Sequence, residues 1–262
     1  MNERHLVECD PHSTGLANYT KSVIYFNPMS SVHKEQIHPE METTGLTGAY
    51  RRLFALLSYN STFIYNEKMH EFKRELFRNL PRFRSGDGTL RLLEIGCGSG
   101  ANFQYYPDGC TVICIDPNVH FDRYLRKNME ENKHLCYEGF LVESGERLTH
   151  VEDASVDVVV CTLVLCSVRN VRKVLQEVRR VLRTGGAFYF LEHVVSECSS
   201  WLRFLQFVLN PLWSRLGEGC TLTRATWRDL EAAGFSHLHI QHISAPKMST
   251  VITPHIMGYC IK

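Results

Sequence analysis

Apolar residues fall into two alternating patterns over most of the chain. From residue 89 onward, short apolar or β-branched runs alternate with segments whose apolar residues recur at helical spacing. The runs that we interpret as strands are Leu90–Ile95, Thr111–Ile115, Phe140–Glu143, Val156–Cys161, Ala187–Leu191, Leu238–Ile243 and Ile256–Cys260. The helical segments are Asn102–Tyr106, His120–Asn132, Val171–Leu182, Trp201–Leu216 and Arg224–Ala233. This order predicts an α/β fold with a mostly parallel, doubly wound sheet of seven strands flanked by helices, the last two strands forming a hairpin-like pair.

The part of the chain before residue 89 divides into two segments. Residues 1–47 are polar and irregular, and we predict a poorly ordered extension. Residues 48–88 are predicted to be an amphipathic helical segment, with Met69, Phe72 and Leu76 at helical spacing. The beginning of this segment either caps the following domain or lies against a membrane surface. Residues 89–262 are predicted to form the catalytic domain.

Charge and cysteine content narrow the class of protein. The 262 residues include 29 basic and 28 acidic side chains, a net charge of +1, which argues against a nucleic-acid partner. Ten cysteines include no C-x-x-C pair, and several lie in strongly apolar runs. We therefore expect reduced core thiols and a reducing compartment. No apolar run reaches the roughly 18 residues of a membrane-spanning helix.

A glycine-rich turn follows the first strand of the catalytic domain. In the run LLEIGCGSG, Gly96, Gly98 and Gly100 permit tight turning and close approach of a ligand to the backbone. Nicotinamide-dependent dehydrogenases use a related G-x-G-x-x-G turn, but here the spacing is G-x-G-x-G. Glu94, two positions earlier, would repel a pyrophosphate and would tolerate the cationic sulfonium and ammonium of S-adenosylmethionine. The turn therefore predicts a site for S-adenosylmethionine.

Further cofactor contacts are expected at the ends of the following strands. Asp116 closes the second strand, 20 positions after Gly96, where a carboxylate can accept both ribose hydroxyls. A local turn with Pro117 is the structural alternative. The other residues that we assign to the cofactor site are Asn118, Gly145, Glu146, Thr162 and Leu163. Of these, Glu146 is expected to cap the adenine amino group.

Two histidines are candidates for the catalytic base. His193 follows the fifth strand and His255 lies in the last loop. A hydrogen-bonded structural histidine remains an alternative for each. Three further histidines lie on the strand-like segment 237–243 without accompanying cysteines or carboxylates, so we predict no metal ion. The segment Trp201–Trp213 is apolar on most sides and forms either a wall of a lipophilic acceptor pocket or ordinary core.

Several motifs together resemble the methyltransferase-like thiol S-methyltransferases. They are LLEIGCGSGANFQYYPDGC, CIDPN, DVVVCTLVLCSV, GCTLTRATW, EVRRVLRTGGAFYFLEHV and PHIMGY, and the resemblance covers residues 64–262. It implies a Rossmann-like class I methyltransferase fold, an S-adenosylmethionine site that includes Gly96, Gly98, Gly100 and Asp116, and a small lipophilic alkyl thiol as acceptor. It also implies the cytosolic face of the endoplasmic reticulum membrane or of lipid droplets. The family begins with a long apolar anchor, whereas this sequence begins with a polar segment, and a cytoplasmic location is the alternative if that difference is decisive.

Other functions remain open at this point. A quinone, lipid or other small molecule could be the acceptor of the same methyl group. A non-catalytic protein of the membrane or lipid-droplet surface could retain the fold. A nicotinamide-dependent reductase is disfavoured by the spacing of the glycine turn and by the last pair of strands.

Overall fold

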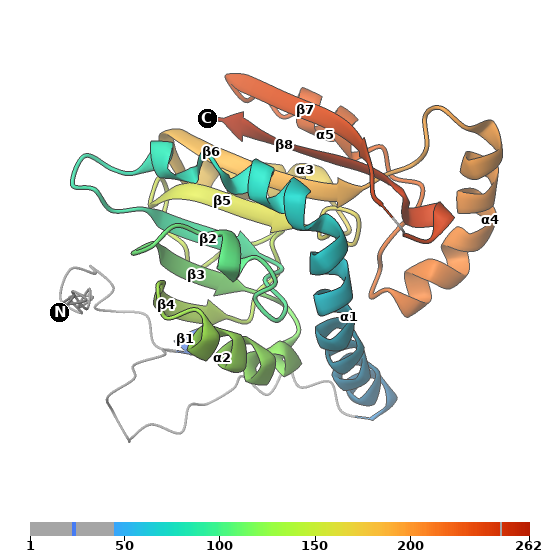
Figure 1. Cartoon of the computed structure of the whole chain (residues 1–262), viewed down its shortest axis with the longest axis horizontal. Coiled ribbons are helices and arrows are strands. Elements are labelled where there is room, and N and C mark those ends of the chain that lie inside the picture. The colour runs from blue at the N-terminus through green and yellow to red at the C-terminus, as the bar shows by residue number, and fades with distance from the viewer. Residues whose placement is uncertain (1–22, 25–44, 247) are drawn as a thin grey trace.

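A single twisted sheet organises the molecule. The computed structural model describes residues 23–24, 45–246 and 248–262, so the prediction for residues 1–47 lies almost wholly outside the described residues. The strands are β1 (Val23–Ile24), β2 (Arg91–Ile95), β3 (Thr111–Ile115), β4 (Cys136–Leu141), β5 (Val156–Thr162), β6 (Leu182–His193), β7 (His237–Ser244) and β8 (Pro254–Ile261). Their order across the sheet is β1-β4-β3-β2-β5-β6-β8-β7 (Figure 1).

The sheet confirms the predicted fold. The four pairings from β4 to β6 are parallel, and β6–β8 and β7–β8 are antiparallel. The seven predicted strands are all present, and β1 adds a two-residue strand antiparallel to β4. β4 begins four residues before its predicted start, because its first half is only partly buried and lacks a continuous apolar run. The carboxyl ends of β2, β3, β5 and β6 therefore meet at one edge, where ligands bind in open α/β sheets.

Helices cover both faces of the sheet. They are α1 (Leu46–Phe77), α2 (Asp122–Glu131), α3 (Val171–Val181), α4 (Ser200–Leu216) and α5 (Thr226–Ala232), with short 3₁₀ helices η1 (Leu80–Phe83), η2 (Phe103–Tyr105), η3 (Val119–Phe121) and η4 (Thr250–Ile252). α3 and α5 pack on one face, and the second half of α1 packs with α2 on the other. In Figure 1, α4 stands apart from the sheet, beyond the end of β6.

Two helical predictions differ from the structure. We predicted that residues 48–88 form an amphipathic helical segment, and the structure has one helix of 32 residues there, α1, which ends at Phe77. Its second half follows the predicted amphipathic pattern, whereas its first half leaves large apolar side chains exposed. The segment Asn102–Tyr106, predicted as a helix, contains only the three-residue helix η2, because Tyr106 precedes Pro107 and is held in an extended conformation.

Local sequence signals explain where two of the helices begin. The side chain of Asn170 accepts a hydrogen bond from the backbone of Lys173, and that of Ser199 accepts one from Leu202. These are N-cap contacts, each contributing about 1 kcal/mol to helix stability. They fix the starts of α3 and α4.

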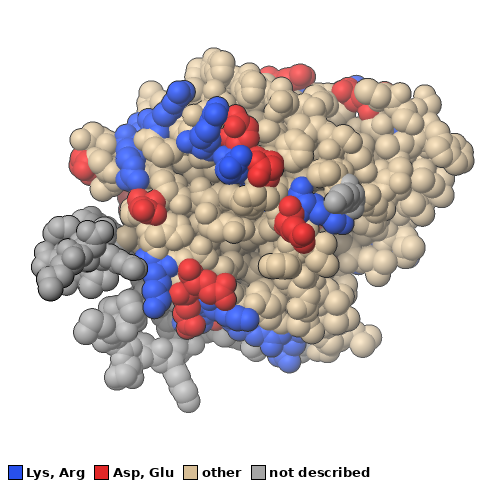
Figure 2. Space-filling view, in the orientation of Figure 1, with Lys and Arg blue, Asp and Glu red and all other residues tan. Residues whose placement is uncertain are grey.

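The cysteines and the surface charges agree in part with what we predicted from the sequence. Of the eight free cysteines in the described part of the chain, only Cys198 is exposed. Cys136 departs from the expectation of reduced thiols, because it is disulfide-bonded. On the face shown in Figure 2, blue and red side chains are interspersed, without a basic stripe. Among the described residues, no helix is both long and apolar enough to cross a membrane.

Candidate active site

The glycine turn between β2 and η2 is a backbone cradle. Gly96 and Gly100 adopt φ of +64° and +81°, in the left-handed region that side chains disfavour. A Cβ on Gly96 would lie 2.2 Å from Val164 Cγ2, and one on Gly100 would lie 2.3 Å from Phe103. The turn therefore requires glycine at both positions, and it exposes main-chain atoms at the end of β2 to a ligand.

Asp116 lies directly against this turn. One carboxylate oxygen accepts from Gly98 N at 3.0 Å and the other from Asn118 N at 2.8 Å. Burial is the main cause that raises the pKa of Asp116 to about 7. The carboxyl group is thus held at the carboxyl edge of β3, where ribose hydroxyls would supply the hydrogen bonds that its remaining lone pairs lack.

The loop that carries Asp116 is covered by residues from two distant segments. Arg51 of α1 donates to Pro117 O at 2.7 Å and forms an ion pair of 3.2 Å with Glu218, in the loop after α4. Asn118 Nδ2 donates to Arg51 O at 3.1 Å and to Glu218 at 3.3 Å. The start of α1 and the loop after α4 therefore close over Asp116 and Asn118.

Glu94 faces the inside of the molecule. Its oxygens accept from Asn102 Nδ2 and from Tyr106 OH, both at 2.8 Å. Asn102 also donates to Thr162 Oγ1 at 3.0 Å, so Thr162 is tied to the same network. Burial raises the pKa of Glu94 to about 7 and lowers that of nearby Lys73 to about 7. Glu94 therefore links the end of β2 to Asn102 and Tyr106, on the segment that follows the glycine turn.

Three further predicted cofactor residues lie in loops at the same edge. Gly145 packs on β2, since a Cβ there would lie 2.6 Å from Ile95 Cγ2. Leu163 adopts φ of +59°, a strained conformation that is enriched at functional sites. Glu146 accepts a hydrogen bond from Asn170 N at 2.7 Å and so supports the start of α3. Its predicted contact with adenine stays a prediction.

The two candidate bases lie next to each other. His193 and His255 are register partners on β6 and β8, and their ring centroids are 6.2 Å apart. His255 Nδ1 is 3.1 Å from Thr253 O, and its Nε2 is 3.5 Å from Tyr65 OH. Burial lowers the pKa of His255 to about 4. His255 is consequently neutral at physiological pH and a weak base.

His193 belongs to a sulfur cluster that the sequence did not reveal. Its Nε2 lies 2.8 Å from Cys220 Sγ, and Cys166 Sγ is 3.7 Å from the same sulfur. Trp213 Nε1 donates to Cys220 Sγ at 3.2 Å. Hydrogen bonding with Cys166, followed by the contact with His193, lowers the pKa of the Cys220 thiol below its usual range.

Glu192, a buried carboxylate, lies next to this cluster. Glu192 is fully buried and accepts from the backbone N–H groups of Val164, Leu165 and Cys166 at 2.9, 3.0 and 3.2 Å. Burial raises its pKa to about 7. Glu192 therefore fixes the loop after β5 against the end of β6. The sequence did contain a signal for it, a single charge within the apolar strand FYFLEH.

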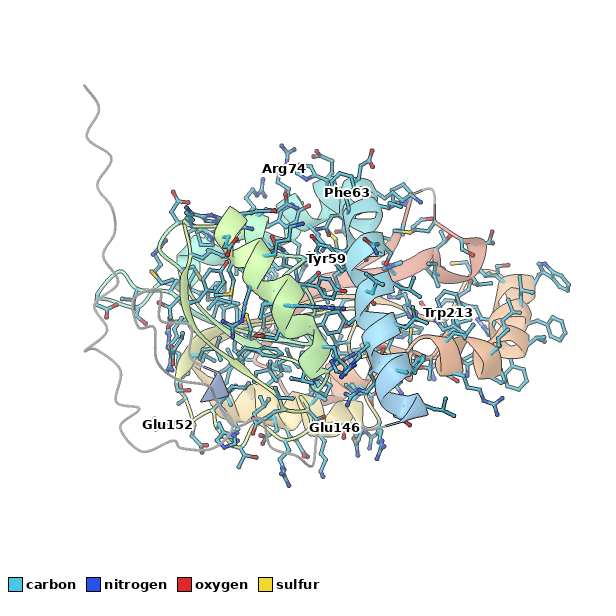
Figure 3. The ribbon with its side chains drawn as sticks, turned by 90° about the horizontal axis from the view of Figure 1, so that it is seen from below. Tyr59, Phe63, Arg74, Glu146, Glu152 and Trp213 are labelled. Carbon is cyan, nitrogen blue, oxygen red and sulfur yellow. The ribbon has the colours of Figure 1, made fainter. Side chains whose placement is uncertain are left out.

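An open groove lies on the outer side of the glycine turn. It has a volume of about 1000 Å³ and runs between α1, η2 and α2, with Tyr59 and Phe63 on its rim (Figure 3). Gly100 is the one predicted site residue in its wall. The groove is therefore separate from the edge that carries Asp116, His193 and His255.

Comparisons with known proteins agree with this geometry. Residues 93–190 match a family described as a methyltransferase domain. The chain is 55% identical over 212 residues to the human thiol S-methyltransferase TMT1A, a match that covers 81% of this chain and 87% of that protein. It is 52% identical to human thiol S-methyltransferase TMT1B, over 75% of this chain and 81% of that one.

A solved structure shows the same fold. It is an S-adenosylmethionine-dependent methyltransferase of Thermotoga maritima, described as a possible histamine N-methyltransferase, with a TM-score of 0.56 and 15% identity. The match covers 82% of this chain and 98% of that one. The cradle at Gly96 and Gly100 and the carboxylate of Asp116 fit the cofactor that such enzymes use, S-adenosylmethionine. The chain is an S-adenosylmethionine-dependent methyltransferase and belongs to the thiol S-methyltransferase family.

Proposed function

We propose that the chain methylates the sulfur of a small, lipophilic alkyl thiol. The observation that carries this proposal is the weakness of His255 as a base on the acceptor side. His255 has a pKa of about 4, and burial raises the pKa of the Tyr65 phenol far above neutral. An unactivated hydroxyl would need a strong base. A thiol with a pKa of about 8.5 is already a few per cent thiolate at pH 7.

The residues of the chain position the cofactor and the acceptor; they do not provide a strong acid or base. S-adenosylmethionine, when bound, supplies a methyl group activated by its sulfonium. Gly96, Gly100 and Asp116 would hold it at the carboxyl edge of the sheet, and Arg51 with Glu218 covers that edge. Holding two reactants in line can contribute about 7–11 kcal/mol to lowering the barrier. The relatives named thiol S-methyltransferases support the same acceptor class.

A chain-length series tests the lipophilic character of the acceptor. Methyl transfer from labelled S-adenosylmethionine is measured for n-alkyl thiols of increasing length and for a hydrophilic thiol such as glutathione. We expect kcat/KM to rise by about threefold or more per added methylene over the first few, because each buried CH₂ contributes about 0.8 kcal/mol. Equal rates for glutathione and the alkyl thiols would contradict a lipophilic acceptor.

We further propose that the chain contacts a lipid surface through an exposed apolar face. This face comprises Leu53, Leu57, Trp201, Phe204, Phe207, Leu212 and Leu216, and each of these side chains is more than half exposed. Tyr50 OH donates to Arg215 O at 3.1 Å, which places the start of α1 beside the end of α4. The part of Figure 2 that corresponds to α4 is largely free of charges. An apolar patch of this kind is typical of a membrane-interaction site.

Flotation with phosphatidylcholine vesicles tests this contact. Phe207→Glu should reduce the bound fraction by about tenfold or more, because it removes an exposed aromatic ring that would insert into the lipid and adds a charge. Thr149→Glu, which adds the same charge at an exposed loop, should leave binding unchanged. Equal binding of both variants would contradict the proposal. We propose the endoplasmic reticulum membrane or lipid droplets as the surface, and microscopy of the tagged full chain in cells tests that location.

A further inference from the structure

Cys166, His193 and Cys220 bring three soft or borderline metal ligands together at the acceptor side. Cys166 lies in the loop after β5, His193 ends β6, and Cys220 follows α4. One ligand atom from each residue lies within 4.8 Å of the other two. Cys166 and His193 are buried and Cys220 is partly exposed, so the cluster is enclosed but reachable from one side.

The spacing of the three atoms is close to that of a zinc site. Zn–S bonds of about 2.3 Å and Zn–N bonds of about 2.0 Å in a tetrahedron place two sulfurs roughly 3.8 Å apart and a sulfur and a nitrogen roughly 3.5 Å apart. The two sulfurs here are 3.7 Å apart. His193 Nε2 is 2.8 Å from Cys220 Sγ and would withdraw by roughly 0.7 Å to admit the ion.

The charges around the cluster also suit a cation. Cys220 Sγ accepts a hydrogen bond from Trp213, whose indole N–H can only donate, so this sulfur acts as an acceptor on that side. Glu192 is fully buried next in sequence to His193, and no Lys or Arg ion pair with it is found among the described residues. A cation held by the three ligands would lie beside this buried carboxyl group.

Three protein ligands leave one position open, which is the pattern of catalytic zinc sites, including those with two cysteines and one histidine. We propose that Cys166, His193 and Cys220 bind Zn²⁺ and that the open position takes the sulfur of the acceptor thiol. This inference rests on the proposed thiol-methylating function. A lone pair of the thiol sulfur forms the bond to zinc, the S–H bond breaks, and its proton leaves to solvent. No protein base is then needed, in agreement with the weak base at His255.

Cobalt titration of the reduced full chain tests the metal site without using methyl transfer. We expect about one equivalent of Co²⁺ to bind, with a thiolate-to-cobalt charge-transfer band that Zn²⁺ abolishes. Cys166→Ser and Cys220→Ser should each lose the band. Cys198→Ser, which removes an exposed free thiol outside the cluster, should keep it. Absence of the band in the wild-type chain, or its retention in Cys220→Ser, would overturn the proposal.

Alkylation of the wild-type chain provides a second measurement that depends on no variant. Zn²⁺ should protect Cys220 from iodoacetamide by at least about tenfold, as measured by peptide mass spectrometry, and leave the labelling of Cys198 unchanged. Equal labelling of Cys220 with and without Zn²⁺ would contradict the site.

The open position is tested by adding acceptors to the cobalt-loaded chain. An alkyl thiol should shift the charge-transfer band and the matched alcohol should not, and an unchanged spectrum with thiol would overturn the role of the fourth position. Cobalt binding without any methyl transfer to thiols would refute the proposed function while leaving the metal ligands in place. Methyl transfer by a chain that binds no metal would refute the zinc site alone.

Discussion

The ligand-binding edge has two halves: a cofactor half with Gly96 and Asp116, and an acceptor half with His193 and His255. The two halves are built in different ways. At the cofactor half, Asp116 meets Gly98 only 18 residues away in the sequence, and the contacts are backbone N–H groups. At the acceptor half, Tyr65 approaches His255 across 190 residues and Cys166 approaches Cys220 across 54. The glycine turn and Asp116 of the cofactor half thus form a local motif, which the distant residues Arg51 and Glu218 cover. The acceptor half is assembled wholly from distant segments. Variants that disturb one half should leave the other measurable.

The largest expected effect is at the glycine turn. Gly96→Ala should weaken S-adenosylmethionine binding by about 100-fold, because the added Cβ meets Val164 at 2.2 Å and the left-handed conformation adds strain. Isothermal titration measures the affinity. Gly109→Ala is the matched control, since Gly109 has φ of +71° but open space around it. If Gly109→Ala lost as much affinity, the collision would not be the cause.

Removing the carboxylate at the end of β3 should have the next largest effect. Asp116→Ala should raise the Kd for S-adenosylmethionine by about 10- to 100-fold, the range for lost hydrogen bonds to a charged group. Asp108→Ala, at an exposed position, should bind as the wild type does. Unchanged affinity in Asp116→Ala would show that the ribose site is elsewhere.

A buried carboxylate at the acceptor half should make stability depend on pH. Because the pKa of Glu192 is raised from 4.5 to about 7 in the folded chain, its contribution is fully present below pH 4.5 and is lost as pH rises through 7. Glu192→Gln cannot ionise, so the Tm of the wild type relative to this variant should fall between pH 5 and pH 8. A constant difference in Tm across this range would contradict an ionising Glu192.

The smallest effect is expected where α1 covers the cofactor half. Arg51→Ala should raise the Kd for S-adenosylmethionine by about two- to fivefold, since it removes a partly exposed ion pair with Glu218 and a hydrogen bond to Pro117 O. The adjacent, exposed Arg52 provides the control, and Arg52→Ala should have no effect. A similar loss in both variants would indicate a general effect of charge rather than this cover.

These contrasts explain what the sequence could predict. The seven main strands and the glycine turn follow from short-range patterns, because a buried parallel strand must be apolar and a left-handed turn requires glycine. His193 was predicted to follow the fifth strand and is the last residue of β6, because the apolar run before it marks that strand. His255 was predicted in the last loop and instead lies near the start of β8, opposite His193. Their pairing with Cys220 and Tyr65 could not be read from spacing, because those partners come from α1 and the loop after α4.

The unpredicted parts share a physical cause. The pKa of His255 depends on burial by groups from several elements, which no local pattern encodes. Likewise, the histidines of segment 237–243 lie close together in the sequence but belong to no proposed metal site. The proposed ligands Cys166, His193 and Cys220 come from two loops and a strand end that are far apart in the sequence. The exposure of α4 could not be predicted either, because a helix that faces a core and one that faces a lipid surface have the same apolar sequence pattern.

Methyl transfer to a matched pair of acceptors tests the central claim most directly. The full chain is incubated with labelled S-adenosylmethionine and either a short alkyl thiol or the alcohol of the same carbon skeleton, at neutral pH. We predict transfer to the thiol and a rate for the alcohol that is at least about 1000-fold lower, because its hydroxyl finds no strong base at His255. Comparable rates for the alcohol, or no transfer to thiols by a chain that binds the cofactor, would contradict thiol methylation.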